Sequence, residues 1–399
     1  MKRLLHYSIQ FAPALFWFFL SCNSPLSGGN SSETTNVAIV TQNGEPAEFA
    51  KVTFVHSDWI SKTLQGISPV IDTVKADDRG TITTGLFPEE VYNIQIDHHN
   101  STLFIPDFSV EGKVLDTLFL QKSASLSGAV GHSDTVSASI HLTGTSYKSS
   151  ICSEGTYLFE NISPRSYSLV AKSDDGRATI IGSQLLEAGA RVEAREVPLS
   201  FSGFLLDDFE DGNTKSALGE FTGGFWYSFM DTILGGNSQL QWSVEPDEDG
   251  YALKSEIALD TTPDAWAGIG LGLSDCGFEF DLTALESISF RAKGTGTVRL
   301  SIESSTVDSI SHWPHFGYTI DLQPQWVKYT ITADSLGVLK NTEVWDSGIT
   351  WKQAAQRITR IEFEASGYYS ETPLIEFWID DLRIEGVTLE EILLQMENQ

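Results

Sequence analysis

Basic residues are scarce in this 399-residue sequence. Lys and Arg number 25 against 54 Asp and Glu, which gives a formal net charge of -29. No stretch concentrates Lys and Arg, so the chain lacks the basic surface that follows a phosphate backbone. This absence argues against nucleic acid as a partner. The acidic excess suits a soluble exterior and sites for hard cations such as calcium.

Cysteine is scarcer still, with three residues: Cys22, Cys152 and Cys276. None of them has the close spacing of a zinc-binding pair. Cys152 and Cys276 fall in different predicted domains, and two distant thiols of this kind are most often small buried apolar residues. An oxidising compartment would permit a disulfide between them.

Familiar catalytic motifs are absent: there is no Gly-x-Ser-x-Gly, no His-Glu-x-x-His, no phosphate-binding loop and no dinucleotide fingerprint. The Glu-x-Asp-x-x-Glu strand of jelly-roll glycosidases has its nearest counterpart at residues 279–286, which miss the spacing by two residues. Asp308, His312 and His315 form only a weak metal-site pattern. We therefore predict that the chain is not an enzyme. Catalytic carboxylates can lie far apart in a sequence, so an unrecognised glycoside hydrolase stays as an alternative.

Long hydrophobic runs are confined to the N-terminus. Lys2 and Arg3 precede an apolar stretch over residues 4–20, a layout typical of a signal peptide rather than a membrane span. Residues 19–22, Phe-Leu-Ser-Cys, resemble a bacterial lipobox, in which the cysteine becomes the lipid-modified first residue. We predict a lipoprotein signal peptide over residues 1–21 and lipidation of Cys22. The alternative is an ordinary signal peptide that is cut nearby.

The predicted anchor determines the expected location. Each buried acyl methylene contributes ~0.8 kcal/mol, so several chains hold a protein on a membrane. Asn23 is not the Asp that resembles an inner-membrane retention signal, so a Gram-negative host would place the protein at the outer membrane. Residues 22–35 are rich in Gly and Ser and are predicted to be a flexible tether. We expect a lipid-anchored protein of the cell envelope or cell surface, with envelope proteins as candidate partners.

From residue 36 the sequence consists of short runs in which apolar and polar residues alternate, and this period of two predicts β-strands. A motif repeats: Gly80 precedes Tyr92 by twelve residues, and Gly155 stands in the same relation to Tyr167. The order of turn, Gly, strand, Pro turn and Tyr strand resembles carboxypeptidase regulatory-like domains. The resemblance implies two small immunoglobulin- or prealbumin-like β-sandwiches, which serve as spacers. They cover residues 36–121 and 122–200.

A third unit, over residues 203–387, holds eight of the ten Trp residues. Residues 287–293 and 298–303 alternate cleanly, with apolar side chains on one side and Arg, Lys, Ser and Glu on the other. One buried face and one wet face are typical of an antiparallel sheet in a sandwich. Residues 388–399 carry apolar residues at helical spacing and are predicted to be a C-terminal tail, either an amphipathic helix or a frayed end. The predicted fold class is therefore all-β.

Several short motifs follow one another in this third unit. In order they are residues 206–210 (Leu-Asp-Asp-Phe-Glu), 264–268 (Asp-Ala-Trp-Ala-Gly), 312–313 (His-Trp), 361–363 (Ile-Glu-Phe) and 377–382 (Phe-Trp-Ile-Asp-Asp-Leu). Their order and spacing resemble family 11 carbohydrate-binding modules and related galactose-binding-like folds. The resemblance implies a β-jelly roll with a glucan-binding cleft and structural calcium.

A sugar ring offers an apolar face on which aromatic side chains stack, and hydroxyl groups that polar and charged side chains satisfy. The predicted carbohydrate-binding residues combine these types: Trp266, Arg291, Arg299, Glu303, His312, Trp313, Tyr318 and Tyr369. Tyr369 is included because Ala365 stands where the family has an aromatic residue. For each of these Trp residues the alternative is that the ring packs in the hydrophobic core and does not stack on sugar. Trp326, Trp351 and Trp378 are predicted to lie in the core because each stands among strand apolar residues.

The resemblance also implies calcium ligands. Asp208 and Glu210 are two residues apart, so they point to the same side of an opening strand. The family pattern pairs them with an Asp in the closing strand, here Asp380, with Asp207 or Asp381 as substitutes. Calcium takes carboxylate and carbonyl oxygens of this kind. The alternative is that these acidic residues lie in ordinary turns of an acidic protein and bind no metal.

These observations predict a non-catalytic cell-surface lipoprotein that binds polysaccharide, of the β-glucan type, through its jelly roll. One alternative is an envelope adhesion or assembly protein whose jelly roll binds protein. Another is a glycoside hydrolase or lyase with an unrecognised carboxylate pair. An exposed aromatic strip favours the first function, an apolar patch without stacking rings the second, and two carboxylates facing each other across a cleft the third.

Overall fold

The computed structural model describes residues 35–41, 43–57, 59–64, 66–84, 91–109, 117–131, 137–248 and 250–398. The predicted signal peptide, Cys22 and the predicted tether up to residue 34 lie outside the described residues. These residues are almost entirely strands and turns with a few short helices, so the predicted all-β class is confirmed. Among the helices that they form, none has the length and hydrophobicity of a membrane span.

The first sandwich has two sheets around a shared core. One has the strand order β4 (Thr81–Thr84), β1 (Thr35–Val40), β7 (Thr117–Phe119). The other has the order β3 (Val70–Lys75), β2 (Lys51–His56), β5 (Val91–His98), β6 (Ser101–Ser109), β8 (Gln121–Lys122), and α1 (Trp59–Leu64) follows β2. The first glycine of the repeat, Gly80, has a φ of +70°, and a Cβ there would lie 2.4 Å from the Ile39 carbonyl oxygen. Close approach of two backbone segments therefore requires glycine at this turn.

The second sandwich repeats this plan. One sheet has the order β12 (Thr156–Ile162), β9 (Ala124–Gly131), β15 (Arg191–Glu193), and β16 (Val197–Pro198) also pairs with β9. The other has the order β11 (Lys148–Ser150), β10 (Ala138–Leu142), β13 (Ser166–Ser173), β14 (Ala178–Leu185). The second glycine of the repeat, Gly155, has a φ of +80°. Tyr157 and Tyr167 are buried in this core.

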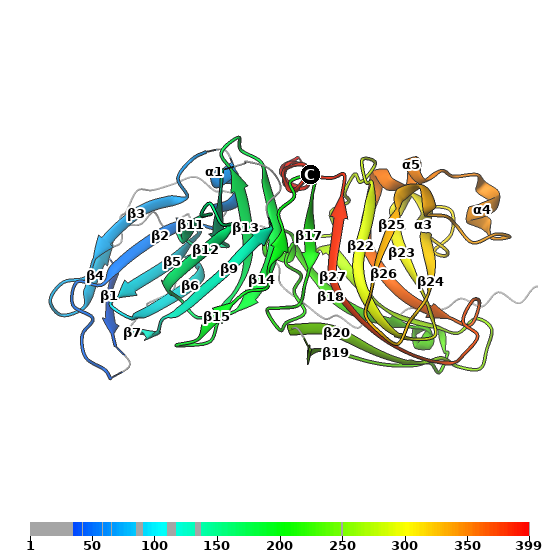
Figure 1. The fold of residues 1–399 in the computed structure, drawn as a ribbon, viewed down its shortest axis with the longest axis horizontal. Coiled ribbons are helices and arrows are strands. Elements are labelled where there is room, and N and C mark those ends of the chain that lie inside the picture. Colours follow the sequence, from blue (N-terminus) through cyan, green and yellow to red (C-terminus); the bar gives the residue numbers. More distant parts are fainter. Residues whose placement is uncertain are drawn as a thin grey trace, which may run out of the picture.

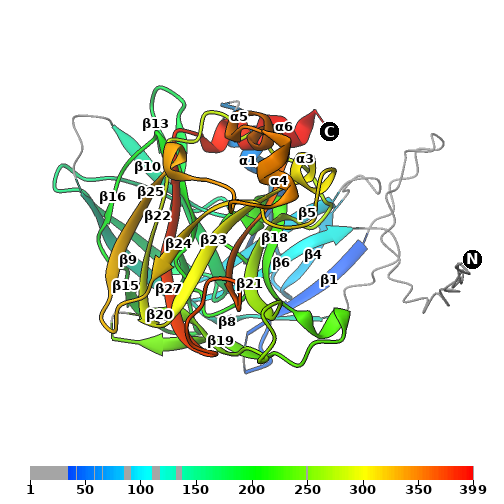
Figure 2. The same cartoon turned by 90° about the vertical axis from the view of Figure 1, so that its right-hand side faces the viewer.

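The third unit consists of two larger sheets. The β27 sheet has the order β19 (Gln239–Asp247), β20 (Gly250–Ala258), β27 (Leu374–Glu385), β22 (Ser287–Thr295), β25 (Val327–Thr332), and β17 (Gly203–Asp207) also pairs with β27. The β26 sheet has the order β18 (Gly223–Met230), β21 (Trp266–Ser274), β26 (Ile358–Ser366), β23 (Thr297–Ser304), β24 (Phe316–Asp321). Short helices α3 (Ser305–Asp308), α4 (Glu343–Ser347) and α5 (Trp351–Ala354) gather at one end of the strands (Figure 2).

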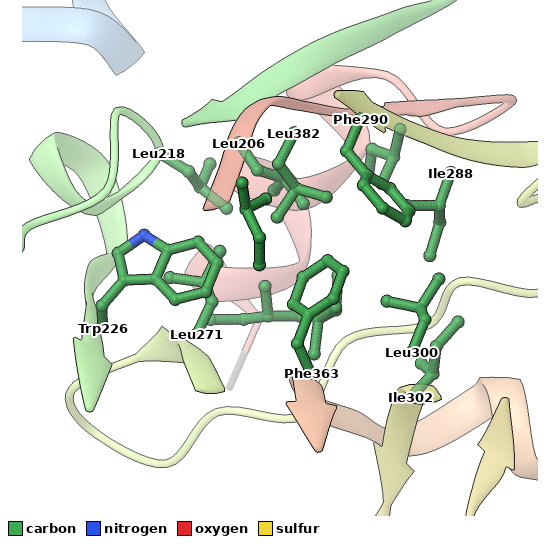
Figure 3. Close-up of a cluster of buried hydrophobic side chains, with 14 of the residues drawn as sticks. Leu206, Leu218, Trp226, Leu271, Ile288, Phe290, Leu300, Ile302, Phe363 and Leu382 are labelled. Carbon is green, nitrogen blue, oxygen red and sulfur yellow. The ribbon is translucent and has the colours of Figure 1, made fainter. Parts of the chain in front are cut away.

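The core of this unit lies between the two sheets. Ile288 and Phe290 enter it from the β27 sheet, and Leu300, Ile302 and Phe363 enter it from the β26 sheet (Figure 3). The Phe290 and Phe363 rings meet edge to face, with centroids 5.0 Å apart. The alternation of residues 287–293 and 298–303 therefore identifies the buried side of both strands correctly. Burial of such side chains is the main favourable term in the stability of a sandwich.

The second sandwich and the third unit share a core. Val170 and Ile180 belong to the same buried cluster as Phe204 and Leu206. Strand β14 lies against β17 at this junction (Figure 1). Helix α6 (Leu389–Glu397) contacts β14 as well, and begins with a capping box between Thr388 and Glu391.

Candidate functional site

The outer face of the β26 sheet is the surface that faces away from the core. Tyr227 lies opposite Gly270, Gly270 opposite Glu362, and Glu362 opposite Ser301. Directly opposed residues share one face of a sheet, and so do alternate residues along a strand. The outer face therefore combines aromatic, glycine and charged positions: Phe225, Tyr227, Phe229, Trp266, Gly268, Gly270, Gly272, Arg299, Ser301, Glu303, Arg360, Glu362 and Glu364.

Four of these side chains form an aromatic row, which we define as Phe225, Tyr227, Phe229 and Trp266. The centroids of successive rings are 6.4, 6.1 and 5.9 Å apart. Phe225 is 47% exposed and the other three rings are partly exposed. Alternate residues of a strand lie roughly 7 Å apart, so the Phe-x-Tyr-x-Phe spacing of β18 produces the row directly.

The row lies over glycines of the neighbouring strand. A Cβ at Gly270 would come within 2.6 Å of the Tyr227 ring, and a Cβ at Gly268 within 2.6 Å of the Phe229 ring. Real side chains do not approach this closely, so these two rings occupy the space that side chains on β21 would fill. Glycine at alternate positions of β21 thus lets the rings cover the strand rather than stand away from it.

Buried carboxyl groups line the other side of the glycines. Glu362 and Glu364 are 5% and 4% exposed. The Tyr227 hydroxyl donates to Glu362 Oε1 at 2.5 Å, and Trp313 Nε1 donates to Glu364 Oε1 at 3.3 Å. Burial raises the pKa of Glu362 well above its usual range, with a further contribution from Glu303, and burial also raises the pKa of Glu364. Protonated carboxyl groups can both donate and accept hydrogen bonds.

Four of the predicted carbohydrate-binding residues join this face. Trp266 ends the aromatic row, and Trp313 bonds to Glu364. The Tyr369 hydroxyl donates to the Glu364 carbonyl oxygen at 3.0 Å. Glu303 Oε2 lies 2.7 Å from Arg360 Nε, so its carboxylate is paired within the face.

Arg299 also belongs to the outer face by register but is only 3% exposed. Its guanidinium donates to the carbonyl oxygens of His315 at 3.2 Å and Gly337 at 2.5 Å. Burial lowers the pKa of Arg299, while the nearby Glu364 opposes this effect. The side chain therefore ties two loops to the sheet beneath the surface.

Three predicted residues lie elsewhere. Arg291 is on β22 in the other sheet, where Asp380 and Asp381 are its ion-pair partners. Tyr318 is opposite Leu300, so it lies on the core side of the edge strand β24 and is 41% exposed. His312 is 93% exposed, and its Nδ1 lies 3.3 Å from Asp308 Oδ1.

The core prediction for Trp326 and Trp378 is wrong. Phe377 and Ile379 point into the core, so Trp378 between them points outward from β27. Lys293 Nζ lies 4.8 Å from the Trp378 ring and 4.7 Å from the Trp326 ring. Both rings are thus half-buried partners of cations on the outer face of the β27 sheet. The remaining member of that prediction, Trp351, does pack against the core.

Glu303, Asp308 and His315 bring three ligand-type atoms within 4.8 Å of one another. His315 Nε2 lies 3.5 Å from Glu303 Oε1 and from Asp308 Oδ1. However, the Ser304 backbone N–H donates to His315 Nδ1 at 3.1 Å. A ring nitrogen that accepts this bond leaves the proton of a neutral imidazole on Nε2, which then has no lone pair for a metal. In this tautomer His315 offers no ligand atom to a metal ion.

The predicted calcium ligands do not form such a group in the described part of the chain. Asp208 accepts bonds from Ser183 of the second sandwich, and Glu210 accepts from the Tyr251 backbone N–H at 3.4 Å. Asp380 Oδ2 lies 3.5 Å from Arg195 Nη1. Each of these three carboxyl groups is thus turned toward a protein group, and the three do not converge on one point where an ion could bind.

The sequence prediction missed the strongest part of the site. Phe225, Tyr227 and Phe229 are not among the predicted residues, although the Phe-x-Tyr-x-Phe spacing and the alternate glycines of β21 are visible in the sequence. Glu362 and Glu364 alternate with the apolar residues Ile361 and Phe363, a pattern that predicts a solvent-exposed side for the two carboxyl groups, but both are buried. Their burial follows from the loops and rings packed over them, which a single strand pattern does not reveal.

No family model matches the chain, and no curated protein does. Among solved structures, the chain is similar to the family 11 carbohydrate-binding module of a cellulosomal cellulase of Clostridium thermocellum, at 16% identity over 47% of this chain and 97% of that chain, with a TM-score of 0.34. The same module from that organism in complex with a β-1,3-1,4-mixed-linked tetrasaccharide matches at 18% identity over 47% and 99%, with a TM-score of 0.33.

A further solved structure, SGBP-B from a complex xyloglucan utilization locus in Bacteroides uniformis, matches over more of this chain. It shares 12% identity over 85% of this chain and 92% of that chain, with a TM-score of 0.27. At these identities and TM-scores the similarities assign no function to this chain.

Proposed function

We propose that the outer face of the β26 sheet binds a polysaccharide without cleaving it. The observation that carries the proposal is the aromatic row over the glycines of β21, beside buried carboxyl groups. Partly exposed rings offer apolar faces to the C–H side of sugars, and the paired side chains of Glu303 and Arg360 at the same face suit their hydroxyls. As part of the same proposal, we expect the polysaccharide to be of the β-glucan type.

Hydrolysis is the alternative that the raised pKa values of Glu362 and Glu364 would favour. Glycosidases place two carboxyl groups on either side of the scissile bond, ~5–10 Å apart. Glu362 and Glu364 instead alternate on one strand and point to the same side. Tyr227 and Trp313 already occupy one oxygen of each. This arrangement supports binding over catalysis.

Attachment to the cell envelope is part of the same proposal. Its support is the basic, apolar and Cys22-terminated N-terminal sequence. Labelling of growing cells with a fatty-acid probe should mark the wild-type protein and leave Cys22→Ser unmarked. A labelled Cys22→Ser protein would overturn the anchor assignment.

Affinity electrophoresis against mixed-linkage β-glucan, xyloglucan, xylan and mannan tests the binding. We expect retardation by at least one of these gels and no release of reducing sugar. Phe225→Ala should lower the affinity about tenfold, equivalent to ~1.4 kcal/mol. Phe119→Ala is the matched control, because Phe119 is 60% exposed on the first sandwich. Equal retardation of both variants, or cleavage of the polysaccharide, would contradict the proposal.

A further inference from the structure

The junction between the second sandwich and the jelly roll is where the predicted calcium ligands lie. Ser183 of β14 binds both oxygens of Asp208: its backbone N–H lies 3.0 and 3.1 Å from them, and its hydroxyl lies 2.5 Å from Oδ1. Asp208 also sits close to the preceding residue of β14, since a Cβ at Gly182 would lie 3.1 Å from Asp208 Oδ2. Hydrogen bonds from the second sandwich therefore occupy both oxygens of the Asp208 carboxylate, which calcium would need as a ligand.

Arg195, which lies between β15 and β16, reaches the closing strand of the jelly roll. Its guanidinium forms an ion pair with Asp381, and Nη1 lies 3.5 Å from Asp380 Oδ2. Arg291 adds a second cation, 3.7 Å from Asp380 and 3.5 Å from Asp381. Four carboxylates, those of Asp208, Glu210, Asp380 and Asp381, raise the pKa of Arg195 against the effect of its burial. The positive charge in this acidic cluster is thus supplied by protein side chains.

The space beside Asp208 and Glu210 is small. Arg195, Asp208 and Glu210 line a cavity of about 20 Å³, which holds roughly one water molecule. Calcium takes six to eight oxygen ligands at about 2.3–2.6 Å, and the carboxylates here are turned to separate partners. The donor set therefore does not fit the metal that the family resemblance implies.

We infer that the Arg195 guanidinium takes the place assigned to calcium, so that the preceding sandwich, rather than a metal ion, holds the opening and closing strands of the jelly roll. Two further hydrogen bonds between the second sandwich and the jelly roll support this role. Thr179 Oγ1 donates to the Gly203 carbonyl oxygen at 2.8 Å, and Ser168 Oγ donates to that of Ala217 at 2.9 Å. The apolar core is continuous across the same junction.

Thermal melting of the full chain in excess calcium and in excess EDTA tests the inference. The wild-type melting temperature should be the same in both solutions. Arg195→Gln should lower it by about 5 °C, because Asp380 and Asp381 lose one of their two cationic partners. Arg191→Gln is the matched control, because it removes the same charge from an exposed position of β15.

The variant also provides a second readout. With Arg195 removed, calcium should raise the melting temperature of Arg195→Gln while leaving that of the wild type unchanged. A wild-type melting temperature that falls in EDTA would overturn the inference, and this arm needs no variant to fold. An equal calcium response of wild type and Arg195→Gln would overturn it as well, as would an Arg195→Gln melting temperature equal to that of Arg191→Gln.

Discussion

At the scale of single residues, two glycines of β21 differ in what surrounds them. A Cβ at Gly270 would meet the Tyr227 ring at 2.6 Å, whereas a Cβ at Gly272 would meet only backbone oxygens, at 3.7 and 3.9 Å. Neither glycine has a positive φ, so the backbone itself accepts other residues at both positions. The two positions therefore differ in their contact with the aromatic row: a side chain at Gly270 would meet the Tyr227 ring, whereas one at Gly272 would not.

We expect Gly270→Val to displace the Tyr227 ring and to lower polysaccharide affinity at least tenfold, while Gly272→Ala retains wild-type affinity. Calorimetric titration measures the affinities, and circular dichroism checks that both variants keep the β-sheet signal. Equal affinities for the two folded variants would contradict the assignment of Tyr227 to the binding face.

Glu362 supports a second prediction at this scale. Its folded-state pKa is raised, so the proton is bound more tightly in the folded chain than in the unfolded chain. The stabilisation is complete below the unfolded pKa and is lost as pH rises through the folded value. Glu362→Gln, which mimics the protonated form, should melt at the same temperature as wild type near pH 5 and at a higher temperature near pH 8. The same difference in melting temperature between Glu362→Gln and wild type at both pH values would contradict the raised pKa of Glu362.

At the scale of elements, β26 carries opposite environments on its two sides. Phe363 is 1% exposed in the core, while the flanking Glu362 and Glu364 lie beneath the outer face. We expect Phe363→Ala to lower the free energy of unfolding by about 3–5 kcal/mol, because the cavity adds to the lost transfer free energy. Denaturant unfolding measures this loss, with Thr359→Ala, a partly exposed β26 position, as the control. A loss below ~1 kcal/mol would argue against the packing in Figure 3.

Local alternation within strands predicts some features of this fold, whereas others depend on residues that are distant in the sequence. Period-two alternation predicts the all-β class and the buried sides of β22 and β23, because alternation is a local property. Trp378 stands among strand apolar residues, which favours a core assignment, but the alternation with Phe377 and Ile379 places it outward, where Lys293 contacts its ring. Glu362 is buried by Tyr227, 135 residues away, so no local pattern predicts its environment.

At the scale of the whole molecule, buried carboxyl groups determine the pH response. Burial raises the pKa of Asp208, Glu210 and Asp380 to about 7, and that of Asp211 to about 6. Because these pKa values are raised in the folded state, the folded chain binds more protons than the unfolded chain between about pH 4 and 7. The contribution of these four groups to stability therefore falls as pH rises across this interval.

The melting temperature should accordingly be higher near pH 5 than near pH 8, which differential scanning calorimetry measures. Asp208→Asn removes one of the contributing groups and should show a smaller fall. A melting temperature that rises from pH 5 to pH 8 would contradict this account of the acidic cluster.

The most direct test of the central claim is the position of a bound oligosaccharide, determined by crystallography of the chain with the sugar that affinity electrophoresis selects. We predict sugar rings against Tyr227 and Phe229, with hydroxyls within hydrogen-bond distance of Glu303 or Arg360. An oligosaccharide bound at another surface, or no binding of any polysaccharide by a cooperatively folded protein, would contradict the assignment of this face.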